Sequence, residues 1–528
     1  MKEIISKEVG KVKEKKRGLV DKLFFLYILA YGFFSSAFLT QFPFVHSDES
    51  WLAGLSRDML TEKSLSVTEH FFDARPRYPH AIKSLFHLLQ MGFIRIFGYS
   101  IESVRLLSLA AGIVFLIIFY FLIKRITKRE KLALAVTVLF SLDVEFIYAS
   151  HFARQEILLG VAFIAGLFLL LGQREPGVMK VVLTAVITGI SIGIHPNSFL
   201  LACSFGAILF YLFLQIKKDI LPLVTYIGVT GAFAAVFVLI SYSFDSQFLK
   251  HYFQNGAMEF DVDASLAAKV SELRGFFERL FTGQSGTYYV TELRFSLLLF
   301  AFLMVFMGIY ALVMKRRLPG ALISGTMGLL GGMIFIGRYN QTSVFFFFPF
   351  GYLLLALFLA EQEEKGKRFI YALILAVTVL ISIEQIRPWL SKGSHAAYLE
   401  QIEELVPKDS TVIANLNTEF YFSQGCLRDY RNLPYVWREK GIEAYIKENG
   451  IEYILYSTEL DYLHEHRPYF NVIYGDIRFV PELKRLCEEK GELIGEFTDT
   501  VYGSRVIGVM GQEKYSHVLV YKLKELDT

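Results

Sequence analysis

Two adjacent carboxylates directly follow the first long apolar segment of the chain. That segment, 23–44, ends just before His46-Ser47-Asp48-Glu49. An ionised aspartate at a membrane surface can take a proton from a substrate hydroxyl, as a general base does. The competing interpretation is structural, because Ser47 or Asp48 could cap a helix with Glu49 in its first turn. The pair alone does not separate these two roles.

Basic side chains in the first outside loop and near the ends of later apolar segments could complete such a site. A phosphate leaving group needs fixed positive charge, and a planar guanidinium suits it well. The candidate phosphate-binding residues are Arg75, Arg77, Lys83, Arg154 and Arg338, and the candidate supporting residues are His46, Glu156 and His195. Structural alternatives stay open: Arg154 with Glu156 as an ion pair at a span end, His195-Pro196 as a helix terminator, and Arg338 as a cation reaching for the interface.

The elements that must position these residues are apolar helices. Of the 528 residues, 54% are hydrophobic and 16% aromatic, which suits a lipid-facing body with aromatic interface belts. A membrane-crossing helix needs about 20 apolar residues. The sequence therefore predicts a mostly α-helical, polytopic membrane protein with about eleven transmembrane helices. The predicted spans are 23–44, 101–123, 132–150, 157–172, 179–194, 198–216, 221–243, 295–314, 318–336, 342–360 and 369–387.

Basic turns set the expected orientation of these spans. Residues 1–22 are lysine-rich and are predicted to stay cytoplasmic, and every even-to-odd connection is short and basic. This layout places Asp48 and the C-terminus outside. Short loops favour a prokaryotic plasma membrane over the endoplasmic reticulum. The predicted domains are the cytoplasmic tail 1–22, a transmembrane domain 23–387 and an extracytoplasmic domain 388–528.

Three outside pieces stand out. The first loop, 45–100, contains an apolar helical stripe in 79–98 that is broken by charges, which predicts an interfacial helix and not a further span. The second, 244–294, has an amphipathic middle. The third, 388–528, alternates helix-like and strand-like segments and is predicted to form a small α/β domain. Its predicted strands are 411–414, 453–456, 493–497 and 518–521.

Several classes of protein and cofactor are not indicated. Three cysteines exclude a disulfide framework, although Cys426 and Cys487 could pair. His46 and His70 lack zinc-ligand spacing, so a divalent metal is open but not indicated, and no cofactor is required. Neither a P-loop nor a dinucleotide-binding glycine fingerprint occurs, and no nucleic-acid partner is expected.

The motifs resemble those of the glycosyltransferase C superfamily, with protein O-mannosyltransferases and aminoarabinose-to-lipid-A transferases as the nearest branches. HSDESWLAGLSRDM is similar to the acidic signature of their first loop. A second pattern of these families is a proline, an interfacial helix and an arginine that opens the second span, and it resembles RPRYPHAIKSLFHLLQMGFIRIFGYSIESVRLLSLAAG. GRYNQTSVFFFFPFGYLLLAL resembles their arginine-tyrosine span start, which adds Tyr339 to the donor-binding residues. The chain has Tyr78-Pro79 and Arg154-Gln155-Glu156 where these families often have paired prolines and Arg-x-Asp.

The resemblance implies a membrane glycosyltransferase. The donor would be a sugar on a polyprenyl phosphate, taken from the membrane lipid, and the acceptor an extracytoplasmic lipid, glycan or protein. Asp48, with Glu49 beside it, would form the catalytic pair, Asp48 acting as base in a single displacement with inversion. Two alternatives remain: a transporter or flippase of a lipid-linked or polar solute, and a non-catalytic assembly or sensor protein. Transporters usually carry charges near the midplane and internal repeats, and this sequence has neither.

Overall fold

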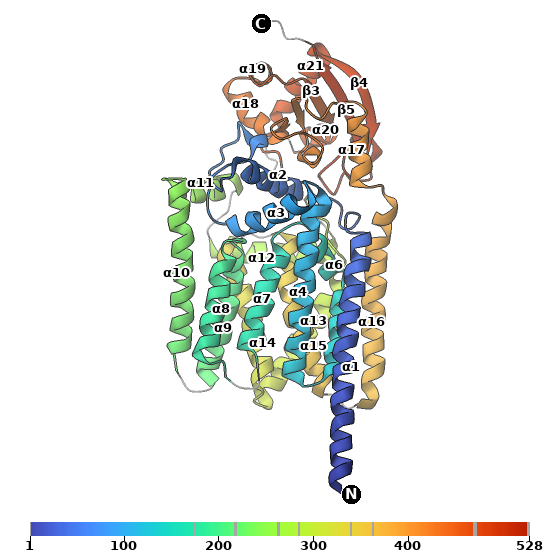
Figure 1. Cartoon of the computed structure of the whole chain (residues 1–528). Coiled ribbons are helices and arrows are strands. Elements are labelled where there is room, and N and C mark those ends of the chain that lie inside the picture. Colours follow the sequence, from blue (N-terminus) through green and yellow to red (C-terminus); the bar gives the residue numbers. More distant parts are fainter. Residues whose placement is uncertain are drawn as a thin grey trace.

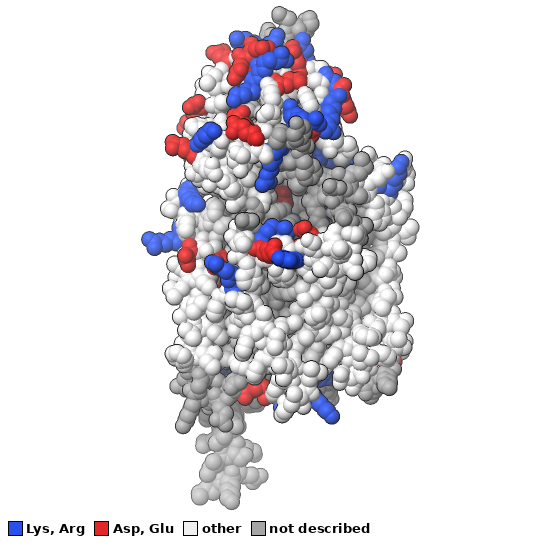
Figure 2. Space-filling model, turned by 180° about the vertical axis from the view of Figure 1, so that it is seen from behind, with Lys and Arg blue, Asp and Glu red and all other residues white. Residues whose placement is uncertain are grey.

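The computed structural model describes residues 2–172, 175–215, 219–260, 265–283, 286–337, 340–361, 364–467 and 473–524. A body of roughly aligned helices carries a smaller mixed α/β domain at one end, and the N-terminus lies at the other end (Figure 1). Uncharged residues cover most of the helical body, whereas charged residues gather on the C-terminal domain (Figure 2). This distribution is that of a membrane protein with one end in water.

Eight helices in the described ranges are long and apolar enough to cross a membrane. They are Gly18–Ala37 of α1 (Lys2–Ala37), α4 (Ile101–Thr127), α9 (Ser198–Gln215), α10 (Leu221–Phe244), α13 (Arg294–Val313), α14 (Arg317–Ile336), Gln341–Glu361, which joins η2 (Gln341–Phe347) to α15 (Phe348–Glu361), and Phe369–Glu403, which begins in α16 (Glu364–Ile386). The chain is therefore a multi-pass membrane protein.

The other three predicted spans are also helical but depart from simple crossings. The segment 132–150 is a bent pair, α5 (Glu130–Ser141) and α6 (Val144–His151), which meet at 68° and would make a ninth span. The segments 157–172 and 179–194 form the shorter apolar helices α7 (Glu156–Leu170) and α8 (Val178–Ser191). The predicted mostly helical fold is confirmed. Eleven spans were expected, and eight to nine helices within the described ranges are long and apolar enough to cross a membrane.

The first outside loop lies across the end of the helical body. It forms α2 (Ser47–Glu62), η1 (His70–Phe72) and α3 (Ser84–Phe97), and α2 and α3 lie between the spanning helices and the C-terminal domain (Figure 1). The amide groups of Leu85 and Phe86 both donate to the carbonyl oxygen of Gly193, which joins α3 to the turn after α8. The loop 244–294 forms α11 (Phe248–Phe260) and α12 (Leu266–Thr282).

The C-terminal domain is built on a five-stranded sheet of order β2-β1-β3-β5-β4. Its first three strands are parallel, and β5 runs antiparallel to both β3 and β4. The strands are β1 (Val412–Ala414), β2 (Leu427–Asp429), β3 (Tyr453–Ser457), β4 (Gly491–Thr498) and β5 (His517–Leu523), and the helices are α17 (His395–Glu403), α18 (Leu433–Glu439), α19 (Ile442–Glu448), α20 (Glu459–His466) and α21 (Val480–Lys490). The predicted α/β character is confirmed, and Cys426 and Cys487 are both free.

Polar contacts fix this domain on the first loop. The side-chain amide of Asn432 donates to the carbonyl oxygen of Phe71 at 2.8 Å and accepts from the backbone amides of Ala74 and Arg75. Asp73 pairs with Arg428 at 3.0 Å and accepts from the Tyr445 hydroxyl at 2.6 Å. The domain therefore contributes directly to the surroundings of α2.

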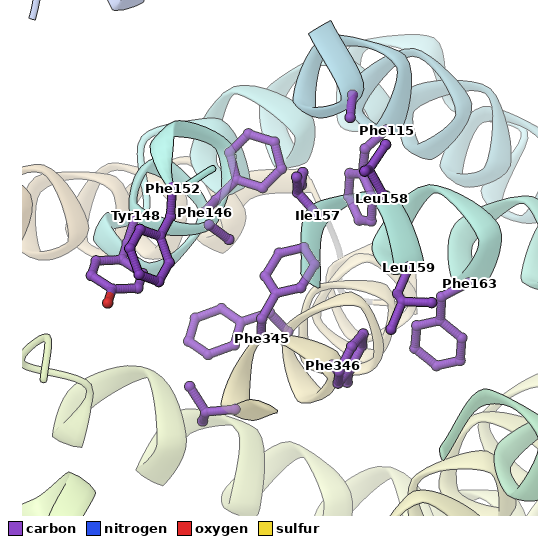
Figure 3. Packing of buried hydrophobic residues seen from close by; sticks show 14 of the residues in the cluster. Phe115, Phe146, Tyr148, Phe152, Ile157, Leu158, Leu159, Phe163, Phe345 and Phe346 are labelled. Carbon is purple, nitrogen blue, oxygen red and sulfur yellow. The ribbon is translucent and has the colours of Figure 1, made fainter. Parts of the chain in front are cut away.

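A buried aromatic core holds the N-terminal end of α7 in place. Phe345 and Phe346 of η2 point toward α7, close to Ile157, Leu159 and Phe163 (Figure 3). A Cβ atom at Gly160 would lie only 2.5 Å from the ring of Phe345, so the close approach requires glycine. This packing fixes the turn before α7, which carries Arg154.

Candidate active site

The acidic pair begins α2, and its cap differs from the predicted one. His46 is the N-cap: its Nδ1 accepts from the Asp48 amide at 3.0 Å, and its own amide donates to Oε2 of Glu49 at 2.9 Å. The expectation that Ser47 or Asp48 caps the helix is wrong, because the histidine ring one residue earlier takes that role. The Asp48 side chain is thereby left for other contacts.

Glu49 is fully buried and bound by Arg105 of α4. The Arg105 Nε and Nη2 atoms donate to the two carboxylate oxygens at 2.8 and 2.7 Å. The guanidinium also donates to the carbonyl oxygens of Leu39, Pro43 and Phe44 at the end of the first span. Neither charged group is exposed to solvent. This network satisfies both charges and ties α2 to α1 and α4.

Glu49 also organises the turn between α6 and α7. Its Oε1 atom accepts from the backbone amide of Ala153 at 2.8 Å. Ser108 of α4 donates to the neighbouring carbonyl oxygen of Phe152 at 2.8 Å. Because Arg154 follows directly, the buried carboxylate fixes the backbone from which this arginine extends.

Asp48 contacts a different set of groups. Its Oδ2 atom accepts from Nη1 of Arg154 at 2.7 Å and from the hydroxyl of Tyr288, which precedes α13. His46 stacks on the Tyr288 ring with 4.5 Å between ring centres. The Oδ1 atom lies 3.7 Å from His46 Nδ1 and accepts no hydrogen bond from the described residues. The side chain is 21% exposed, so one carboxylate oxygen is open to a ligand.

The surroundings keep the Asp48 carboxylate ionised. Burial acts to raise its pKa, but the charge of Arg154 and the hydrogen bond from the Tyr288 hydroxyl outweigh it, so the pKa lies well below the ordinary value. The His46 pKa is itself lowered to about 3 by burial, and its Nδ1 atom is an acceptor. The imidazole is therefore neutral near pH 7, and Arg154 is the cation that stabilises the carboxylate.

Arg154 bridges two carboxylates. Besides Asp48, its Nη2 atom pairs with Glu156 at 3.3 Å, and Glu156 accepts from the Thr342 hydroxyl at 2.8 Å. Asn340 donates to the Tyr288 hydroxyl at 3.2 Å. Segments far apart in sequence, from α2, α7, the loop before α13 and the loop before η2, therefore meet at one point.

A cavity of about 100 Å³ opens beside Asp48. Arg154, Lys83, Arg77 and His195 line it together with Asp48. Lys83, the N-cap of α3, is half-buried and forms no ion pair or hydrogen bond with a described side chain. Burial, followed by the charges of Arg77 and Arg154, lowers the pKa of Lys83 to about 8. An unpaired lysine among other cations is a favourable place for an anion.

The other predicted phosphate-binding residues differ in their surroundings. Arg77 makes two hydrogen bonds to Glu69, at 3.1 and 2.9 Å, and stacks over Trp51. Arg75 does not line the cavity and stacks over Phe72, beside the C-terminal domain. Arg338 and Tyr339 lie outside the described residues. The Nδ1 atom of His195 accepts from the amide of Asn197 at 3.0 Å.

Sequence reasoning missed several residues of this site. Tyr288 lies in the loop 244–294, where nothing in its neighbourhood marks it as functional. Arg105 was noticed only as the arginine that opens the second span, and its partner Glu49 could not be inferred from spacing. Arg431 and Arg505 of the C-terminal domain also lie near His46 and were not considered.

No metal site emerges from the described side chains. Over the described ranges, no three His, Cys, Asp or Glu side chains gather so as to hold a metal ion. Independence from a metal or cofactor remains a prediction.

Comparison with known proteins gives one family match. Residues 85–253 match the family described as dolichyl-phosphate-mannose-protein mannosyltransferase, PMT. This segment begins in α3 and ends in α11, and it contains Arg154 and Glu156. A comparison with curated proteins finds no match.

Two solved structures are similar to the chain. Archaeal oligosaccharyltransferase AglB from Archaeoglobus fulgidus, in complex with an inhibitory peptide and a dolichol-phosphate, has a TM-score of 0.54 at 13% identity, covering 91% of this chain and 74% of that one. ArnT from Cupriavidus metallidurans, bound to undecaprenyl phosphate, has a TM-score of 0.48 at 14% identity, covering 96% and 98%. The AglB likeness shows a shared fold. The PMT match, over residues 85–253, is in line with the resemblance to the glycosyltransferase C superfamily.

Proposed function

We propose that the chain is a membrane glycosyltransferase that moves a sugar from a polyprenyl phosphate to an acceptor on the side of the C-terminal domain. The observation that carries this proposal is the arrangement around Asp48. An ionised carboxylate with one open oxygen lines a cavity that also contains the unpaired Lys83 and the buried Arg154. The PMT match and the AglB-like fold support the same class of reaction.

Asp48 is the proposed general base. The Oδ1 atom accepts the hydrogen bond of the acceptor hydroxyl, while Arg154 and Tyr288 fix Oδ2. The hydroxyl oxygen forms a bond to the anomeric carbon as the bond from that carbon to the phosphate oxygen breaks. The proton passes to Asp48, and the sugar inverts its configuration. A carboxylate of low pKa takes this proton late, when the attacking oxygen has become acidic.

Lys83 and Arg154 are the proposed partners of the leaving phosphate. Both line the cavity, and their positive charge stabilises the oxygens that become more negative as the bond to the sugar breaks. Arg77 is less available to bind the phosphate, because Glu69 already accepts two hydrogen bonds from its guanidinium. Glu49 is assigned a positioning role, since Arg105, Ala153 and His46 occupy its oxygens.

The position of the charges disfavours a transporter. The ionisable groups of this site lie on α2, α3 and the turns at one end of the helical body. A transport site typically lies near the midplane, on interrupted helices.

The test combines envelope analysis with one substitution. Mass spectrometry of envelope lipids and glycans from cells with and without the gene identifies the missing sugar. Asp48→Asn should then reduce its transfer by about 10²- to 10⁴-fold, the usual contribution of a general base. Glu62→Gln, an exposed acid at the end of the same helix, should leave transfer unchanged. Near-normal transfer by Asp48→Asn would overturn the assignment.

A further inference from the structure

Two arginines of the C-terminal domain have buried donors without partners. Arg431 is 6% exposed and Arg505 is 5% exposed. The Nη2 atom of Arg431 and the Nε and Nη1 atoms of Arg505 are buried and form no hydrogen bond within the described part of the chain. Leaving charged donors unsatisfied costs about 1–3 kcal/mol each or more, so a buried guanidinium needs a partner such as water or an anion.

The nearby carboxylates do not satisfy these donors. The Oδ1 atom of Asp429 accepts from the backbone amide of Arg431 at 3.0 Å and from its Nε atom at 2.7 Å, and the Nη2 atom of Arg431 is left without a partner among the described residues. Glu459 accepts the backbone amides of Arg505 and Val506, and the hydroxyl of Tyr474, so its oxygens are not directed at the Arg505 guanidinium. The two guanidinium groups thus keep free donors despite these acids.

The charges of both arginines interact with the Asp48 carboxylate. The guanidinium of Arg431 stacks over Trp51 of α2, 4.9 Å from the ring centre, and over Phe72, at 4.4 Å. The positive charge of Arg505 acts on both His46 and Asp48 and helps to lower the pKa of each. Asn432, next to Arg431, is hydrogen-bonded to the first loop, which fixes this approach.

These donors are separate from the cations of the cavity. Lys83, Arg77 and Arg154 line the cavity beside Asp48, whereas Arg431 and Arg505 do not. They belong to the domain that covers α2 on the side opposite the spanning helices (Figure 1). A lipid-linked donor enters from the membrane, so the C-terminal domain faces the acceptor.

We propose that Arg431 and Arg505 form an anion-binding subsite that holds a phosphate or carboxylate group of the acceptor next to the hydroxyl that receives the sugar. The acceptor would therefore be an anionic envelope molecule. This inference rests on the proposed function, which supplies the distinction between donor and acceptor. The subsite acts on acceptor binding and takes no part in proton transfer.

The test measures binding of two probes to the full-length protein in detergent by calorimetry, at matched ionic strength. Sodium pyrophosphate probes the arginine subsite, and undecaprenyl phosphate probes the donor site. The wild-type protein saturated with undecaprenyl phosphate should still bind pyrophosphate. The double variant Arg431→Gln, Arg505→Gln should bind pyrophosphate at least tenfold more weakly and undecaprenyl phosphate as before.

Controls separate charge from folding. Lys83→Gln should lower the affinity for undecaprenyl phosphate. It should leave unchanged the affinity for pyrophosphate that is measured with undecaprenyl phosphate present. Arg438→Gln, an exposed arginine of the same domain, should change neither affinity. Thermal unfolding shows whether each variant is folded. If the double variant is unfolded, Arg505→Gln alone replaces it, and its affinity for pyrophosphate should be several-fold weaker than that of the wild-type protein.

Two results would overturn the proposal. Weaker binding of undecaprenyl phosphate by the Arg431 and Arg505 variants would assign the arginines to the donor phosphate. Unchanged pyrophosphate affinity in these variants, measured with saturating undecaprenyl phosphate, would remove them from any anion site. Failure of every protein to bind undecaprenyl phosphate would instead count against the proposed function, while the pyrophosphate comparison would still judge the arginines.

Discussion

Asp48 and Glu49 are neighbours in sequence, yet their surroundings differ in almost every respect. Glu49 is sealed between α2 and α4, with Arg105 bound to both of its oxygens and no contact with solvent. Asp48 keeps one oxygen open beside a cavity and shares the other between Arg154 and Tyr288. Successive residues of a helix point about 100° apart, so adjacent acids reach different neighbours. A fully satisfied carboxylate serves the fold, and an incompletely satisfied one is available for chemistry.

The largest effect is expected when the charge of the buried Glu49 is removed. Glu49→Gln leaves the buried Arg105 without a counter-ion, which should cost about 3–5 kcal/mol of stability. Thermal unfolding of the purified protein should show a large loss, whereas Asp48→Asn should unfold near the wild-type temperature. Equal stability of the two variants would contradict the division of roles.

A second test concerns Tyr288, whose hydroxyl donates to Asp48 and not to Glu49. Tyr288→Phe removes a hydrogen bond to a charged group, worth about 1.5–3 kcal/mol. Transfer should fall on the order of tenfold to a hundredfold, and the pKa of Asp48 should rise toward its ordinary value. The pH profile of transfer should therefore lose activity at a higher pH on its acidic side. The matched control is Tyr289→Phe, because the neighbouring hydroxyl bonds to Gln385 and not to Asp48.

Donor binding should also respond to pH through Lys83. Its pKa of about 8 means that the ammonium loses its proton as the pH rises through that value. Affinity for undecaprenyl phosphate should be full below about pH 7 and weaken on the order of tenfold by about pH 9. Lys83→Arg should remove this loss, since a guanidinium stays charged. A wild-type affinity that is flat across this range would exclude Lys83 as the phosphate ligand.

The smallest effect is expected where an ion pair is exposed. Arg274 and Glu278 of α12 lie 2.7 Å apart, and their side chains are 81% and 59% exposed. Water screens this pair, so Arg274→Gln should change stability by about 0.5 kcal/mol or less. Thermal unfolding of Arg274→Gln and Glu49→Gln should be compared. A much larger loss of stability in Glu49→Gln would show that burial decides how much an ion pair contributes to the stability of this protein.

Part of this fold could be predicted from sequence because its signals are local. The apolar lengths and basic turns of 101–123 and 295–314 mark helices that the structure contains as α4 and α13. The short strand β2 was missed, because three residues that include Arg428 and Asp429 give no alternating pattern. The bend between α5 and α6 was also missed, since 132–150 has the length and apolar character of one continuous span, and Asp143, which caps α6, lies inside it.

The sequence by itself determined that apolar helices dominate, that an acidic pair follows the first of them, and that an α/β domain follows the last. It also placed Asp48, Lys83 and Arg154 among the candidate residues. Only the tertiary structure decided that Glu49 is bound by Arg105, that Tyr288 reaches Asp48, and that Arg431 stacks over Trp51 of α2. The physical reason is distance along the chain: hydropathy and capping are set by neighbouring residues, whereas these contacts join side chains that only packing brings together.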